Sequence, residues 1–427
     1  MAAVMLTALP SAAAPPTYRV DYVVTIRRKD PTRAHIRWLL AGIEEIAGFR
    51  LVFRDARTTG VSGTGRLAWE GHTLHWTPGS PYAHLAYTVD IDHHRPANGP
   101  RFDGHADPEW IAARALHLFP EIHVNFRPGA EQAHSAARLL FRLPRGWRSA
   151  ATGERLGDDV YAVDEPGKRF DRPRGWLLLG HIARHHRTVA GMTVTVASAP
   201  GVGIDPHRIL RLYARAVPLL TGPLGPPPPR VLVVSAPDPM WHGGLSGEDS
   251  FFVNGRIPLR SPDKTSTYLH ELFHVWFPLR VADDGHWISE GLAEYYSLAL
   301  QHRAGRLSDA GFARGVFLFR RFGRWNLDLS RTHESAALNN SAPLVMHWID
   351  REIARVTGGQ HGLDDAVRTV VADGGPLTTA AFLRAVNRTA GRDFTPLFRR
   401  HVYRGEPPPT PAPEAPQTGL PVRGPVR

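Results

Sequence analysis

The stretch from His270 to His274 reads H-E-x-x-H, with Glu271 directly after the first histidine. Ser261-Pro262-Asp263 and Pro278 predict the start and the end of a helix of about four turns around it. On such a helix His270 and His274 project about 40° apart, so their imidazoles can bind a single metal ion. Glu271 flanks the same face and can reach a water on that metal without being a ligand.

A second helical segment, Trp287–Tyr296, offers two more carboxylates four residues apart, and the turn at 282–285 lets it fold back beside the first helix. A catalytic zinc needs a third protein ligand and an open position. We expect Glu290 to be that ligand and Glu294 to accept a hydrogen bond from a ligating imidazole. The reverse assignment is one alternative, and carboxylates that only pair with arginines are another. Zinc would lower the pKa of its water toward 7, and Glu271 would take the proton.

These segments resemble the glycyl aminopeptidase family, which belongs to the gluzincin group of zinc metallopeptidases. The resemblance covers about residues 200 to 408. It is carried by His270–Trp276, Trp287–Tyr296, Trp241–Ser250, Ile349–Gly359 and Phe398–Gly405. It implies a thermolysin-like catalytic domain, one zinc ion per chain, and aminopeptidase-like hydrolysis of peptide or protein substrates at or near their N-terminus.

The segment that resembles the family's cleft-edge strand departs from the family pattern. Gly243 and Gly244 lack a Cβ, so the backbone of an extended peptide can approach closely. The family's next glutamate would bind a substrate ammonium, but Ser246 occupies its position and Glu248 follows two residues later. Either a bulge at Ser246-Gly247 restores the register and Glu248 binds the ammonium, or Glu248 lies in a solvated turn.

A second departure concerns the tyrosine that steadies the oxyanion in the family. Asn339 stands at that position, and Ser341 and Ala342 replace the Lys-Gly that follows it. The donor would then come from Asn339, from His333 or from a loop tyrosine such as Tyr295. Loss of one oxyanion donor typically costs about 10²–10³ in turnover. An alternative function is therefore a catalytically weak or inactive zinc-holding scaffold that binds peptides or proteins.

The chain is predicted to be of the α+β class, and its N-terminal part is predicted to be β-rich. Residues 17–200 contain short, β-branched segments such as Tyr18–Ile26 and Met192–Ala197, with frequent glycine and proline between them. A β-sandwich-like domain is expected there. Residues 1–16 resemble the end of an export signal, with an apolar run followed by small residues, which predicts a periplasmic or secreted protein.

Residues 201–405 are predicted to form the mostly helical, thermolysin-like zinc peptidase domain. Asp205–Leu220 has apolar residues at helical spacing behind an Asp-Pro start, and Arg230–Ser235 has the pattern of a buried strand. Residues 406–427 are rich in proline and are expected to form a disordered tail.

Composition narrows the classes of function further. The 427 residues include no cysteine, which excludes thiol nucleophiles, disulfides and cysteine-ligated zinc. The net charge is +11, but the basic residues are scattered and almost all are arginine, so no basic stripe for nucleic acid is seen. No run of about 18 apolar residues predicts a membrane span.

Overall fold

The computed structural model describes residues 17–54, 56–95 and 101–409. The predicted export-signal remnant (1–16) and nearly all of the predicted disordered tail (410–427) lie outside this range. The described chain divides into two compact units. The first runs to Arg184 and includes Ala197–Pro200 and Ala236–Trp241, and the second comprises His185–Val196, Gly201–Ser235 and everything from His242 onward.

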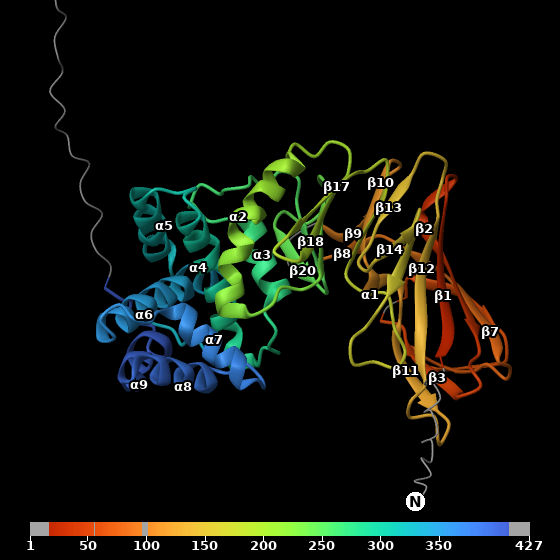
Figure 1. Cartoon of the computed structure of the whole chain (residues 1–427). Helices are drawn as coiled ribbons and strands as arrows, with labels where there is room; N and C mark the ends of the chain where they lie inside the picture. The colour runs from red at the N-terminus through yellow and green to blue at the C-terminus, as the bar shows by residue number, and fades with distance from the viewer. Residues whose placement is uncertain (1–16, 55, 96–100, 410–427) are drawn as a thin grey trace, which may run out of the picture. The chain divides into compact units, whose positions relative to one another are not determined.

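The first unit consists mainly of β-strands (Figure 1). Among the described residues these strands form three sheets, with the orders β14-β15-β12-β1-β2-β7-β4, β13-β16-β10-β9-β8 and β11-β3-β6-β5. The strands are β1 (Thr17–Arg27), β2 (Asp30–Ala41), β3 (Ile46–Val52), β4 (Thr58–Gly63), β5 (Arg66–Glu70), β6 (Thr73–Thr77), β7 (Tyr82–Asp90), β8 (His93–His94), β9 (Phe102–Ala106), β10 (Trp110–Arg114), β11 (Glu121–Phe126), β12 (His134–Arg142), β13 (Arg148–Ala150), β14 (Arg155–Gly157), β15 (Val160–Val163) and β16 (Trp176–Gly180). One short helix, α1 (Ala115–Leu118), interrupts them.

Strand β2 shows why this part of the sequence forms sheets. Ala34, Ile36, Trp38 and Leu40 alternate with polar or half-exposed residues, and all four are buried. Side chains on a strand point to opposite faces in turn, so this alternation places one apolar face on the core. β2 pairs antiparallel with β1, and β1 pairs parallel with β12. The β-rich character predicted for the N-terminal part is confirmed.

The second unit combines one sheet with most of the helices. Its sheet has the order β17-β18-β19-β21-β20. The strands are β17 (Ala183–Val189), β18 (Met192–Ser198), β19 (Arg230–Ser235), β20 (Gly244–Gly247) and β21 (Ser250–Val253). The α-helices are α2 (Pro206–Leu224), α3 (Thr267–Trp276), α4 (His286–Arg303), α5 (Asp309–Phe322), α6 (Ala342–Val356), α7 (Leu363–Asp373), α8 (Thr379–Ala390) and α9 (Thr395–Phe398). A short 3₁₀ helix, η2 (Asp283–Gly285), and two short π-helices, η3 (Ala337–Ser341) and η4 (Arg399–Tyr403), accompany them. None of the described helices has the length and apolarity that a membrane span requires.

The division of the chain differs from the single break predicted at residue 200. Strand β18 was predicted within the N-terminal domain, but it lies beside β19 in the sheet of the second unit. Met192, Val194 and Val196 are fully buried in that unit's core. The strand pattern of residues 192–197 fixes the local structure, whereas the choice of sheet depends on a partner that lies more than thirty residues away.

The helix that carries H-E-x-x-H is shorter than predicted. α3 begins at Thr267, after Ser266, because residues 261–265 close a turn of their own. In this turn the Ser261 N–H donates to the Thr265 carbonyl, and Lys264 has a φ of 80°. The end of the helix is as predicted, since α3 stops just before Pro278, whose ring is incompatible with a continuing helix.

Helix α4 lies beside α3 and α6 and contacts both. The contact between α4 and α6 is close because Gly291 has no side chain. A Cβ on Gly291 would lie 3.0 Å from the Cβ of Ala342 in α6. Most residues of α4 after His286 are buried between its neighbours. The pairing of α3 with α4 therefore positions the carboxylates of α4 against the histidines of α3.

Candidate active site

The structure brings together the three residues that the sequence predicts as metal ligands. One ring nitrogen each of His270 and His274 and one carboxylate oxygen of Glu290 lie within 4.8 Å of one another. The two Nε2 atoms are 3.0 Å apart. The carboxylate of Glu290 spans both rings, with Oε2 at 3.3 Å from Nε2 of His270 and Oε1 at 3.4 Å from Nε2 of His274. Three donor atoms thus converge on one point between α3 and α4.

The remaining ring nitrogens are held by residues of α4. Nδ1 of His270 lies 2.7 Å from Oε2 of Glu294, and Nδ1 of His274 lies 3.4 Å from the hydroxyl of Ser289. A hydrogen on Nδ1 of His270, donated to Glu294, leaves Nε2 of the same ring as a lone-pair donor. The two glutamates of α4 therefore take different positions, with Glu290 inside the cluster and Glu294 behind it. Sequence reasoning missed Ser289, although it directly precedes Glu290.

The charges of the cluster depend on one another. Burial would lower the pKa of His270, but hydrogen bonds with Glu290 and Glu294 raise it well above its usual value. Burial would raise the pKa of Glu290, but the hydrogen bonds from His270 and His274 hold it below its usual range. The side chain of Glu290 is 30% exposed, against 12% and 14% for the histidines, so the cluster opens to solvent on its side.

Glu271 lies beside this cluster but faces strand β20. It is buried, and burial raises the pKa of its carboxyl, although the neighbouring histidines oppose that shift. A Cβ on Gly244 of β20 would lie 2.7 Å from both Cγ and Cδ of Glu271, closer than real Cβ contacts occur. Only glycine therefore permits this approach of the strand backbone to the carboxylate.

Strand β20 is an edge strand of its sheet among the described residues, and it forms a regular hairpin with β21. Gly244 pairs with Val253 and Gly247 pairs with Ser250, with no shift of register between them. The bulge that was one of the two predicted arrangements is therefore absent. Glu248 is exposed and lies with Asp249 in the two-residue turn, which is the other arrangement. Asp249, the second residue of this turn, adopts a φ of 50°, in the left-handed region.

The three candidate oxyanion donors lie in different parts of the second unit. Tyr295 is part of α4 and not of a loop, and its buried hydroxyl donates to Oδ2 of Asp350 at 2.6 Å. The hydroxyl of Tyr295, one of the three alternative donors, is therefore engaged by Asp350. Asn339 is exposed on η3, which packs against α4. His333 is exposed, with its ring 6.0 Å from that of His286.

A second group of metal-ligating residues, His93, Asp103 and His117, lies in the first unit. Its members are scattered in sequence, so no spacing pattern pointed to it. The two imidazoles stack with centroids 3.9 Å apart, and Nδ1 of His117 is buried with no partner among the described residues. The guanidinium of Arg95 lies 3.8 Å from the carboxylate of Asp103. Burial lowers the pKa of His117, and the positive charge of Arg57 lowers it further. This positive surrounding disfavours a divalent cation, and no H-E-x-x-H accompanies the group.

Comparison with solved structures identifies proteins of similar fold. An aminopeptidase N family protein from Idiomarina loihiensis is 13% identical with a TM-score of 0.69, and the match covers 91% of this chain and 76% of that one. An M1 zinc metallopeptidase from Deinococcus radiodurans is 16% identical with a TM-score of 0.60, covering 94% and 96%. Legionella pneumophila aminopeptidase A, solved with aspartic acid, is 13% identical with a TM-score of 0.53, covering 91% and 49%.

These similarities show that the chain has the fold of the M1 zinc metallopeptidases. One of the similar structures, a variant of the Deinococcus enzyme, was solved with a Tyr-Ser-Ala substrate. No family model and no curated protein sequence matches the chain. The predicted α+β class agrees with this fold.

Proposed function

We propose that this protein is a zinc-dependent metallopeptidase of the gluzincin type, with aminopeptidase-like action related to that of the glycyl aminopeptidases. The observation that carries the proposal is the convergence of His270, His274 and Glu290 on one point, with the buried carboxyl of Glu271 beside them. The M1 fold supports it, because the similar structures include a zinc metallopeptidase and an aminopeptidase N family protein.

The residues present fit a zinc ion. Two imidazole nitrogens and one carboxylate are a donor set that zinc takes in catalytic sites, which keep a further position open. The two Nε2 atoms are 3.0 Å apart and each lies within 3.4 Å of a carboxylate oxygen of Glu290, so all three groups can bind one shared cation. We assign His270, His274 and Glu290 as the ligands and Glu294 as the residue that orients His270. When bound, zinc supplies Lewis acidity, which lowers the pKa of a coordinated water and polarises the substrate carbonyl.

Glu271 would act as the general base and then as the general acid. Its carboxylate would take a proton from the attacking water and pass it to the leaving amine, so one group serves both halves of the reaction. The raised pKa of Glu271 suits this role, because a base that is too acidic holds the proton poorly. Its burial against Gly244 fixes the carboxylate in one position.

Strand β20 would hold the substrate. It is an edge strand, and an extended peptide can add to such an edge through main-chain hydrogen bonds. Because Gly244 contacts Glu271, a peptide along this edge would pass directly over the general base. Gly243 belongs to the same segment, and its carbonyl accepts the N–H of Asn254 across the hairpin.

The second candidate function is a zinc-holding scaffold that binds peptides or proteins with weak or no turnover. Two observations favour it: Asn339 occupies the position of the family's tyrosine, and Tyr295 is bound to Asp350. Incubation with a mixed peptide library, with and without a chelator, separates the two functions. Chelator-sensitive cleavage supports the peptidase, and its cleavage positions distinguish removal of N-terminal residues from internal cutting. Binding without cleavage supports the scaffold.

A further inference from the structure

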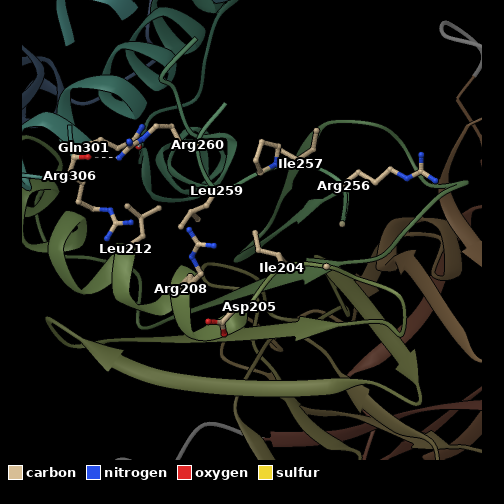
Figure 2. Close-up of a pocket in the computed structure, with 13 residues that line it drawn as sticks. Ile204, Asp205, Arg208, Leu212, Arg256, Ile257, Leu259, Arg260, Gln301 and Arg306 are labelled. Carbon is tan, nitrogen blue, oxygen red and sulfur yellow. Dashed lines mark hydrogen bonds between the residues drawn. The ribbon is translucent and has the colours of Figure 1, made fainter. Parts of the chain in front are cut away.

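A pocket of the second unit lies between the start of α2, the loop 255–260 and the end of α4 (Figure 2). Its volume is about 600 Å³, which lies within the range of small-molecule sites. It is distinct from the metal cluster, because Gln301, which lines it, follows Glu290 by three turns of α4. At 1.5 Å per residue this separation is about 16 Å.

The charged groups of this pocket are mainly arginines. Arg208, Arg256, Arg260 and Arg306 line it, with Asp205 as the one acidic residue among the lining residues. The carboxylate of Asp205 is already engaged, because it caps α2 by accepting the His207 N–H at 2.8 Å and lies 3.4 Å from Arg211. Among the described residues, Arg208, Arg260 and Arg306 therefore form no ion pair with a carboxylate of the pocket.

Three of these arginines lie around Leu212 and Leu259 in Figure 2, whereas Arg256 points away from them. Arg208 forms no side-chain hydrogen bond or ion pair with any residue that the structure describes. Nε of Arg306 is buried and likewise has no hydrogen-bond partner among the described residues. An unsatisfied buried donor of this kind costs free energy unless a ligand pairs with it.

Arg260 is held in place. Its Nε donates to Oε1 of Gln301 at 2.8 Å, and one amino group donates to the carbonyl of Arg306. Gln301 is buried, and its own amide donates to the carbonyls of Lys264 and Ser297, each at 2.8 Å. This network fixes the guanidinium before any ligand arrives, which reduces the entropy lost on binding.

The pKa of Arg306 reflects the positive charge around it. Burial lowers the pKa of its guanidinium, and Arg260, Arg215, Arg208 and Arg211 lower it further. The fold therefore places several positive charges close together in this pocket although they repel one another. A bound anion would remove this repulsion.

The rest of the lining is apolar and comes from Ile204, Ile257, Pro258 and Leu259. A bare inorganic anion would leave this surface uncovered and most of the volume empty. Three guanidiniums carry more positive charge than one carboxylate can neutralise, and their planar forks match the oxygens of phosphate groups. The ligand therefore needs several negative charges at one end and an organic body at the other.

We propose that this pocket binds a small organic molecule of the phosphate-ester or diphosphate class. Its phosphates lie between Arg208, Arg260 and Arg306, and its body lies against Ile204 and Leu259. The inference does not depend on the proposed peptidase activity, because none of these residues belongs to the metal cluster or contacts Glu271.

The test is isothermal titration of the full chain at low ionic strength with three probes: adenosine diphosphate, pyrophosphate and citrate. We expect one adenosine diphosphate per chain, bound more tightly than pyrophosphate. Arg208→Ala should weaken this binding about tenfold or more, since a charge-assisted contact is lost. Arg208 is exposed, so its truncation leaves the fold intact, and Arg306→Gln provides a second variant.

Two controls keep the result specific. Arg384→Ala removes an exposed arginine of α8 and should leave binding unchanged, which excludes a general attraction to the net charge of +11. His270→Ala should also bind normally, which excludes chelation at the metal cluster. Citrate that binds more tightly than both phosphate probes would overturn the phosphate class. Absence of binding at millimolar concentration, or binding that neither arginine variant weakens, would overturn the site.

Discussion

Gly244 and Glu271 are in direct contact, because a side chain at position 244 would overlap Cγ and Cδ of the glutamate. One residue lies on the edge strand β20 and the other on α3, which are separated in sequence by the whole of β21 and a loop. The contact couples the surface proposed to hold a peptide to the group proposed to move its protons.

The Gly244→Ala substitution should reduce kcat while zinc stays bound. The added methyl group displaces the carboxylate of Glu271, and a misplacement of about 1 Å can cost roughly 10²-fold in rate. Steady-state kinetics test the reduction of kcat, and metal analysis of the same preparation tests whether zinc stays bound. Gly157→Ala is the matched control, since a Cβ there meets nothing within 4 Å. A Gly244→Ala enzyme with the wild-type kcat would contradict the positional role of this contact.

The Glu271→Gln substitution should keep zinc and lose about 10²–10⁴ in kcat, because the amide preserves the shape of the side chain but cannot accept a proton. Metal analysis and peptide cleavage together measure this. Normal cleavage by this variant would show that another residue acts as the base.

Zinc content should separate the two glutamates of α4. Wild-type protein should contain close to one zinc per chain, and His270→Ala or Glu290→Gln should lose it on dialysis. Glu294→Gln should retain a site that is weaker by about 10–100-fold, because only the orientation of His270 is lost. If Glu294→Gln loses the metal and Glu290→Gln keeps it, the assignments are reversed. A folded wild type that takes up no zinc contradicts the metal site altogether.

Recognition of a free N-terminus should not depend on Glu248. This residue is exposed in the β20–β21 turn, where water screens its charge. We expect Glu248→Gln to cleave free and N-acetylated versions of one peptide in the same ratio as the wild type. Selectivity for the free peptide that disappears in Glu248→Gln would restore this residue as the ammonium ligand.

Acid should destabilise the second unit through His347. This side chain is buried, and burial lowers its pKa from 6.5 to about 4. Between these two values the unfolded chain binds a proton that the folded chain does not, so stability falls as the pH falls from about 6.5 toward 4. The full effect is on the order of 3 kcal/mol. Urea unfolding at several pH values should show that the free energy of unfolding depends less steeply on pH in His347→Leu than in the wild type. Substitution of the exposed His361 by leucine should leave the wild-type pH dependence of this free energy. An unchanged slope in His347→Leu contradicts this assignment.

The local parts of the site could be read from the sequence because they depend on short spacings. Two histidines four residues apart share a face on any α-helix, whatever surrounds it. Asp205 before Pro206 likewise fixes the start of α2, and its carboxylate accepts the His207 N–H as a cap. Strand β19 has the predicted bounds, since a short apolar run behind four prolines has little freedom to shift. The start of α3 was misplaced because Ser261–Thr265 satisfies its backbone in a separate turn.

The sequence by itself determined that His270, Glu271 and His274 share a helix and that two glutamates follow on another, because helical periodicity is a local property. Tertiary structure decided which glutamate enters the cluster, since the angle between α3 and α4 sets which carboxylate meets Nε2 and which meets Nδ1. It also decided that β18 joins the second unit and that Tyr295 turns to Asp350. The arginine pocket depends on three distant segments. Packing between such segments is fixed by contacts that no local spacing encodes.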